Sequence, residues 1–271
     1  MVKNRIMKTI YKIVALSVFA ALFSACTLDV QDNFEFTPEF LDEDPFSNIT
    51  AWEFIQSQGT VAILDDQNRK RLNGEKLDFM AAAIKRVGYE DLYNQTTTSD
   101  RTYLFLNNNA FTGNNRDRDI IRLVTGNTQG GGSLVNPDTL MASITAPDQI
   151  NILKAVLRYN IVSTFVAQVP TLTIFDRDFL FKTFLPTLEL DEDGTPIALT
   201  NEFADIAFRR DTRWDININN PSSPLPESAL GRDFDETVRV HNIVLNNGIG
   251  HIMNDLVRFQ PYPLYANFPI D

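Results

Sequence analysis

The order of the expected elements predicts an α+β fold, because helical patterns dominate the first part of the chain and strand patterns the second. Apolar residues recur at helical spacing up to about residue 162, and they alternate with polar residues beyond it. The chain has 271 residues, of which 44% are hydrophobic, and this suffices for one sizeable core. We therefore expect a single α+β domain.

Four elements are expected in the first part. Helices are predicted over residues 50–58 and 75–87, the second with apolar residues at helical spacing up to a stop at Gly88. Residues 101–106 are apolar on both alternating faces, which is typical of a strand covered on both sides. A third helix is expected to start at residues 145–148, which have the form of a capping box with proline in the first turn.

Strands are expected in the second part. Alternation of apolar and polar residues predicts one strand over residues 204–209 and another over 214–219. Composition predicts loops at 126–133 and 219–226. The aromatic residues interleaved with proline at 259–269 favour a segment that covers a core edge, and docking of a partner is the alternative.

The last expected element is a β-hairpin over residues 238–257. Asn-Gly at 247–248 favours a two-residue type I′ turn, because both central residues of that turn need a positive φ. With this turn Val244 pairs with His251. His241 and His251 then lie on opposite faces of the sheet and cannot share a metal ion.

Residues 1–25 carry the features of a secretion signal. Four basic residues and no acidic residue precede the end of an apolar run at 13–23, which is too short to span a bilayer core of ~30 Å. Residues 22–26 resemble the lipobox of bacterial lipoproteins, in which the cysteine becomes the N-terminus and is acylated, as with palmitate. We expect Cys26, the only cysteine, to be lipidated; a secreted protein with a leftover thiol is the alternative.

Residues 26–47 are expected to form a lipidated acidic tether. Seven acidic residues and no basic residue lie between Cys26 and Pro45. In some Gram-negative groups such residues resemble a signal for the outer face of the outer membrane. We expect outer-membrane localisation with exposure on the cell surface, and a solvated linker without that address is the alternative.

Residues 247–254 resemble the second signature of the fasciclin domains of cell-surface and matrix adhesion proteins, Asn-Gly-Val-Ile-His-Val-Ile-Asp. Gly250 replaces a branched residue, and Asn254 replaces an aspartate. The signature residues that this chain keeps most clearly are Asn247, Gly248 and His251.

Residues 102–111 align without gaps on the first fasciclin signature, Thr-Val-Phe-Ala-Pro-Thr-Asn-Asp-Ala-Phe, and lose its proline at Leu106. The residues kept there are Thr102, Asn108, Ala110 and Phe111. Residues 153–162 are similar to a family helix that ends in Leu-Tyr-His-Val-Val, with Tyr159 kept and the histidine replaced by Asn160. Since that Tyr-His pair is a proposed adhesion motif in animal members, the replacement counts against integrin-type binding.

The resemblance implies a fasciclin-like domain, with helices packed on a mostly antiparallel β-sheet wedge. The domain would occupy residues 48–271, which exceeds the usual fasciclin length, with enlarged loop insertions near 112–144 and 185–230. The resemblance also implies a non-enzymatic role in binding or adhesion to proteins or glycans.

Composition and motifs argue against other chemistries. A net charge of −11 disfavours nucleic-acid binding, and one cysteine with two histidines gives no zinc motif, so we expect no metal and no cofactor. The glycine-rich residues 126–133 lack the ending of a phosphate-binding loop, and 191–194 favour a hairpin turn over a calcium loop. We expect His251 to be a buried structural imidazole, and no spacing singles out a catalytic pair of carboxylates.

Two binding functions remain open. Adhesion to host matrix, neighbouring cells or glycans follows from the fasciclin resemblance. The alternative is an accessory surface lipoprotein of a TonB-dependent nutrient import complex, which captures peptides or glycans. The sequence does not discriminate between them, and it identifies neither the ligand nor the oligomeric state.

Overall fold

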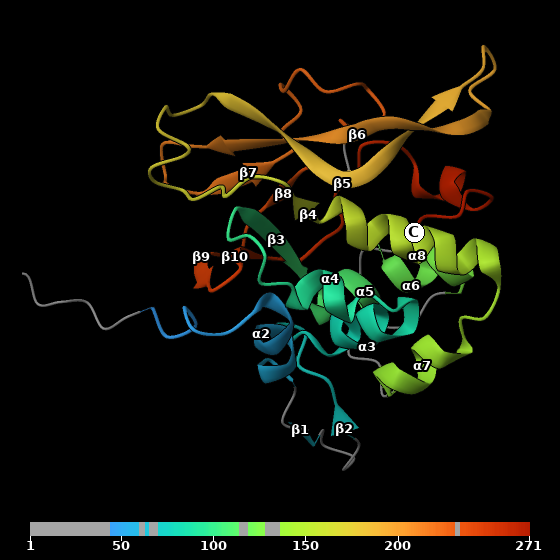
Figure 1. Ribbon diagram of the computed structural model, residues 1–271, viewed down its shortest axis with the longest axis horizontal. Helices are drawn as coiled ribbons and strands as arrows, with labels where there is room; N and C mark the ends of the chain where they lie inside the picture. The colour runs from blue at the N-terminus through green and yellow to red at the C-terminus, as the bar shows by residue number, and fades with distance from the viewer. Residues whose placement is uncertain (1–43, 60–62, 65–69, 114–118, 128–135, 231–233) are drawn as a thin grey trace, which may run out of the picture. The chain divides into compact units, whose positions relative to one another are not determined.

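The computed structural model describes residues 44–59, 63–64, 70–113, 119–127, 136–230 and 234–271 (Figure 1). The predicted signal, Cys26 and almost all of the acidic tether lie outside these residues. Within the described part of the chain, none of the helices has both the length and the apolar character needed to cross a membrane.

Helices make up most of the first half of the described chain, as predicted. The α-helices are α2 (Ala51–Ser57), α3 (Asp78–Val87), α4 (Glu90–Asn94), α5 (Asn108–Thr112), α6 (Ile120–Thr125), α7 (Pro137–Ser143) and α8 (Pro147–Tyr159), and a 3₁₀ turn, η1, spans Tyr262–Tyr265. The Thr50 side chain accepts from the Glu53 N–H, and the Glu53 carboxylate accepts from the Thr50 N–H, which caps α2. Gly88 ends α3 in the left-handed region with φ of 72°.

Eight strands form one mostly antiparallel sheet, and β1 (Ile63–Leu64) and β2 (Lys70–Arg71) form a separate pair. The strands of the sheet are β3 (Arg101–Leu106), β4 (Ile161–Val162), β5 (Asp178–Leu190), β6 (Pro196–Arg210), β7 (Ile216–Ile218), β8 (Glu236–Thr237), β9 (Val240–Leu245) and β10 (Gly248–Met253). Their order is β8-β7-β6-β5-β4-β3-β10-β9, and of these neighbours β3 and β10 run parallel. The α+β class is confirmed.

The long β5–β6 ribbon lies along one side of α8, and the other helices lie on the far side of α8 (Figure 1). The Tyr159 hydroxyl at the end of α8 donates to the Asp205 carbonyl of β6 at 3.1 Å and thereby links helix to ribbon. All residues of β3 after Arg101 are buried, as the two-sided apolar pattern predicts. Tyr262 and Tyr265 are buried as well, so the C-terminal aromatic segment covers the core rather than offering these rings to a partner.

Two local predictions are wrong. The helix α8 begins with Pro147 as predicted, but its N-cap is Ala146 and no side chain caps it, so there is no capping box. Trp214 lies in a turn with φ of 72° and not in β7. The predicted insertion near 185–230 contains the end of β5 and all of β6 and β7; the strand expected over 204–209 lies within β6, and residues 191–194 form the predicted turn.

The predicted register of the last hairpin is also wrong. Leu245 pairs with Gly248 and Val244 with Ile249, so Asn246 and Asn247 are the central residues of the turn. The reason is that Gly248 already pairs with Arg101 of β3 and therefore belongs to strand β10.

Candidate binding surface

Thr102, predicted from the first fasciclin signature, is a buried link between β3 and the segment after β4. Its hydroxyl donates to the Thr164 carbonyl at 2.6 Å and accepts from the Val166 N–H at 2.8 Å. Burying these polar groups without such partners would destabilise the fold. The role of Thr102 is therefore structural.

The other residues of the first signature fasten α5 to α3. Asn108 accepts from the Phe79 N–H at 3.0 Å, and its side chain is buried. Ala110 and Phe111 are fully buried, and the rings of Phe111 and Phe79 stack with centroids 5.7 Å apart. None of these side chains is available to a ligand.

Tyr159 and Asn160, at the position of the proposed adhesion pair, are both fully buried. The Tyr159 hydroxyl accepts from Asn219 Nδ2 at 2.9 Å, and Asn160 Nδ2 donates to the Val156 carbonyl at 2.8 Å. Burial raises the pKa of Tyr159 far above its usual value. In the described structure this pair offers nothing to an outside partner.

Asn247 of the second signature is a buried connector with all its amide groups in use. Its Oδ1 accepts from the Ala51 N–H at 2.9 Å, and its Nδ2 donates to the carbonyls of Tyr93 and Gln95 at 2.9 and 2.8 Å. The hairpin is thereby tied to α2 and to the end of α4. This contact also explains why Asn247 sits inside the turn.

His251 is a buried neutral imidazole, as predicted. It is 0% exposed, its Nε2 donates to the Val166 carbonyl at 2.8 Å, and its Nδ1 accepts from the Asn242 N–H at 3.2 Å. Burial lowers the pKa of His251 to about 4; the bond to Val166 raises it in part, and the neighbouring His241 lowers it further. Both nitrogens are occupied, so His251 has no free lone pair for a metal or a substrate.

Two departures from the fasciclin signatures compensate one another in space. The chain has Phe105 where the first signature has alanine, and Gly250 where the second has a branched residue. A Cβ on Gly250 would lie 2.2 Å from Cε2 of the Phe105 ring. The large residue on β3 therefore fills the volume that the small residue on β10 leaves.

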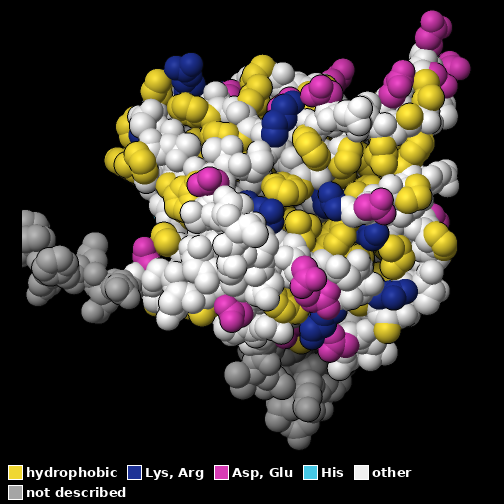
Figure 2. All heavy atoms as spheres, viewed as in Figure 1, with side chains coloured by type: hydrophobic (Ala, Val, Ile, Leu, Met, Phe, Trp, Pro, Cys, Tyr) yellow, Lys and Arg dark blue, Asp and Glu magenta, His cyan; other side chains and the backbone are white. Residues whose placement is uncertain are grey.

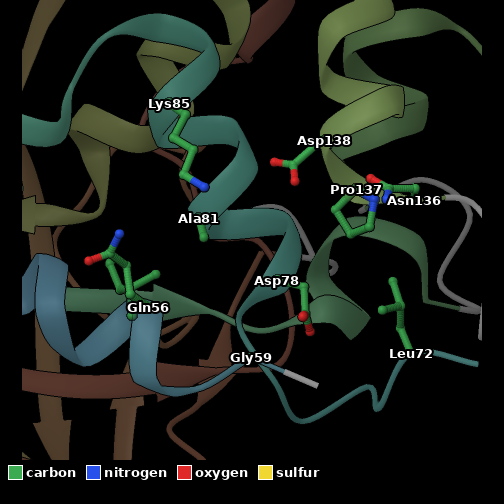
Figure 3. A pocket seen from close by; sticks show the side chains of 10 residues that line it. Gln56, Gly59, Leu72, Asp78, Ala81, Lys85, Asn136, Pro137 and Asp138 are labelled. Atoms are coloured by element: carbon green, nitrogen blue, oxygen red, sulfur yellow. The ribbon is translucent and has the colours of Figure 1, made fainter. Parts of the chain in front are cut away.

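A cleft of about 460 Å³ lies where α2, α3 and α7 approach one another. Figure 3 shows Lys85 and Asp138 facing its space from α3 and α7, with Asp78 at another part of its wall. The Asp78 carboxylate accepts from Asn108 Nδ2 at 2.8 Å.

The strongest candidate for a binding surface is an exposed apolar group where β6 ends and the loop before β5 folds over it. We call it the aromatic corner and define it as the exposed Val169, Ile174, Phe175 and Trp214 together with the buried Arg210. The side chains of Val169 and Trp214 are 54% and 52% exposed, and those of Ile174 and Phe175 are 47% and 41% exposed. Figure 2 shows hydrophobic side chains gathered at the corner of the molecule where β5 begins and β6 ends. Exposed apolar groups of this kind mark interaction sites.

Arg210 lies beneath the two aromatic rings of the corner. Its guanidinium carbon is 4.2 Å from the centroid of the Phe175 ring and 4.6 Å from that of Trp214, and the two rings are nearly perpendicular. The side chain is 4% exposed, and Nη2 donates to the Thr173 carbonyl at 2.9 Å. Its Nε is buried without a hydrogen-bond partner.

The backbone around the aromatic corner is strained at three residues. Trp214, Asp176 and Asn242 have φ of 72°, 53° and 61°, in a region that side chains other than glycine rarely occupy. Gln168 ties two of these segments together, because its side-chain Nε2 donates to the Trp214 carbonyl and its backbone N–H donates to Asn242 Oδ1. Strained residues gather at functional sites more often than elsewhere.

The sequence did not reveal this surface. Trp214 follows the alternation of the next strand, and Arg210 stands next to another arginine at the end of a strand pattern. The loop of residues 163–177 is brought to them by contacts between segments distant in the sequence, such as the pairing of β5 with β6 and the bridge between Phe175 and Arg210. One signal in the sequence was available. Trp214 is an apolar residue among the charged residues Asp211, Arg213 and Asp215, which is unusual for a buried strand position.

No family model matches the chain, and no curated protein matches it. Among solved structures, the chain is similar to a FAS1 domain pair of the insect cell adhesion molecule fasciclin I, with 9% sequence identity and a TM-score of 0.43. The match covers 78% of this chain and 51% of that one, so the chain spans about half the length of that structure.

Proposed function

We propose that this chain is a non-enzymatic, fasciclin-like binding domain, anchored in the outer membrane by a lipid on Cys26 and exposed at the cell surface. The observation that carries the binding role is the aromatic corner, where two exposed rings cover a buried arginine that has no acidic partner in the described part of the chain. The fasciclin-like assignment is supported by the burial of the signature residues and by the paired exchange at Phe105 and Gly250. Its non-enzymatic character is supported by His251, whose two nitrogens are both engaged.

Replacing Cys26 with alanine is expected to move the protein from the membrane fraction to the soluble one. The anchor would consist of acyl chains, and each buried CH₂ group contributes about 0.8 kcal/mol, so several chains anchor the protein stably. Without the cysteine the acyl chains cannot be attached. Fractionation and a shift in electrophoretic mobility measure the change, and Ser24→Ala serves as the control. Continued anchoring of the Cys26 variant would refute the lipoprotein assignment.

Adhesion and nutrient import differ in what accompanies the protein. We propose adhesion first, and an accessory role beside a TonB-dependent transporter as the alternative. Extraction of the full chain in mild detergent, followed by mass spectrometry of the co-purified proteins, separates them. Stoichiometric recovery of such a transporter would favour import, whereas recovery of the chain alone, with binding to matrix or glycan arrays, would favour adhesion.

The same purification tests the aromatic corner directly. We expect Trp214→Ala to reduce whatever binding is found by tenfold or more, because an exposed aromatic anchor contributes a large share of binding free energy. Ile197→Ala is the matched control, since Ile197 is 57% exposed at the opposite end of the same β5–β6 ribbon. Equal binding by the Trp214 variant and the control would remove the corner from the proposal.

A further inference from the structure

Arg210 has no acidic counter-charge among the described residues. Within the described part of the chain no carboxylate lies within ion-pair distance of it, and its one hydrogen bond goes to a neutral carbonyl. The neighbouring Arg209 differs, because it forms a two-pronged ion pair with Asp178 at 3.0 and 2.6 Å. Burying a charge without a partner destabilises a fold, so the unpaired state of Arg210 calls for a physical reason.

The two rings supply part of that reason. A cation over an aromatic face is attracted by the ring quadrupole, and Arg210 faces two rings at once. This attraction is weaker than that of a carboxylate, and the buried Nε still lacks an acceptor. The guanidinium is held in place by the protein but is not neutralised by it.

We propose that the aromatic corner binds glycan chains that carry carboxylates, that is, polymers of uronic acids. The proposal rests on the binding role proposed above and names its ligand class. A sugar ring has an apolar face that stacks on an exposed indole, and a carboxylate held beside the rings is attracted by the positive charge of Arg210 beneath them. Because water screens a buried guanidinium only weakly, a carboxylate beside the rings gains more attraction than it would from a surface lysine.

The shape of the corner favours a glycan over a protein partner. A stable protein interface covers about 800 Å² on each side, with several anchors in pockets. The corner offers instead two perpendicular rings around one cation, which matches one or two sugar units. The ties from Gln168 and the strained Trp214 backbone hold the indole in place before the ligand arrives, which lowers the entropy cost of binding.

The test compares charged polymers with neutral polymers of the same backbone. The full chain in mild detergent is titrated with polygalacturonate and alginate and with both polymers after chemical reduction of their carboxylates. We expect at least tenfold tighter binding to one of the charged forms than to its reduced form, and a loss of that preference as salt is raised. Equal affinity for charged and reduced polymers, or no binding to any of them, overturns the proposal.

Two variants locate the effect. Trp214→Ala is expected to weaken binding to the charged polymer by tenfold or more, while Ile197→Ala leaves it unchanged. Arg210→Lys is expected to weaken the charged polymer selectively, and circular dichroism checks that it folds. If uronate polymers do not bind but Trp214→Ala still abolishes capture of a protein partner, the carboxylate inference fails and the binding role stands.

Discussion

Replacing Gly248 with valine is expected to destabilise the domain by roughly 3 kcal/mol or more, a large fraction of the 5–15 kcal/mol typical of a folded domain. Gly248 has φ of 150°, and a Cβ there would lie 2.3 Å from the carbonyl oxygen of Arg101. Backbone strain of about 1–2 kcal/mol adds to overpacking of about 1–3 kcal/mol, since the opposing atom belongs to a rigid backbone. Urea unfolding followed by circular dichroism measures the loss.

Alanine at position 248 can be compared with alanine at position 194. The comparison separates the strain of a positive φ from the steric clash of a Cβ with neighbouring atoms. Gly194 has φ of 78°, and a Cβ there would meet no atom within 4 Å. Alanine at 194 is therefore expected to cost about 1 kcal/mol, from the left-handed conformation alone. Alanine at 248 should cost clearly more. Equal losses at both sites would mean that β3 and β10 do not approach as closely as the structure shows.

The framework of the domain could be predicted where short-range patterns decide. The apolar faces of β3, the stop at Gly88 and the turn at 191–194 depend on neighbouring residues, and the structure confirms all three. The hairpin register could not be predicted from Asn-Gly alone. The Asn247 side chain donates hydrogen bonds to the carbonyls of Tyr93 and Gln95, about 150 positions away in the sequence. A contact between such distant segments overrides a local turn preference.

The candidate site was beyond the reach of sequence patterns for the same reason. Trp214 belongs to a turn organised by Asp211, whose carboxylate accepts from the N–H groups of Arg213 and Asp215 at 2.8 and 2.9 Å. The sequence of residues 211–215 is compatible both with an alternating strand and with this turn, so the apolar pattern could not distinguish the two structures. The position of Phe175 beside Arg210 arises from a bridge across 35 positions of the chain.

The signature departures at Phe105 and Gly250 show the opposite case. Taken separately, each weakens the fasciclin resemblance. In the structure they lie against each other, and the phenylalanine ring occupies the space of the missing branched side chain. A pair of changes that preserves the local volume is tolerated best in a packed core.

We expect His251 and Asp119 to change the free energy of unfolding with pH in opposite directions. Burial lowers the pKa of His251 to about 4, below its unfolded value of about 6.5. Its contribution to the free energy of unfolding is therefore complete above pH 6.5 and falls by roughly 3 kcal/mol as the pH drops to 4. Burial and the charge of Asp255 raise the pKa of Asp119 to about 6, which has the opposite sign. Protonating Asp119 between pH 6 and 4 stabilises the fold, because its buried carboxylate has no hydrogen-bond partner.

Single variants separate the two contributions, which have opposite signs in the native chain. His251→Gln keeps an amide that can donate to the Val166 carbonyl but cannot become charged. Relative to the native chain, this variant should lose stability at pH 7 and recover it as the pH falls to 4. Asp119→Asn removes the opposing carboxylate, so its stability should fall more steeply over the same range. Urea unfolding at pH 7, 6, 5 and 4 measures all three chains. A His251→Gln curve parallel to that of the native chain would mean that His251 titrates normally and is not the buried neutral link between β10 and Val166.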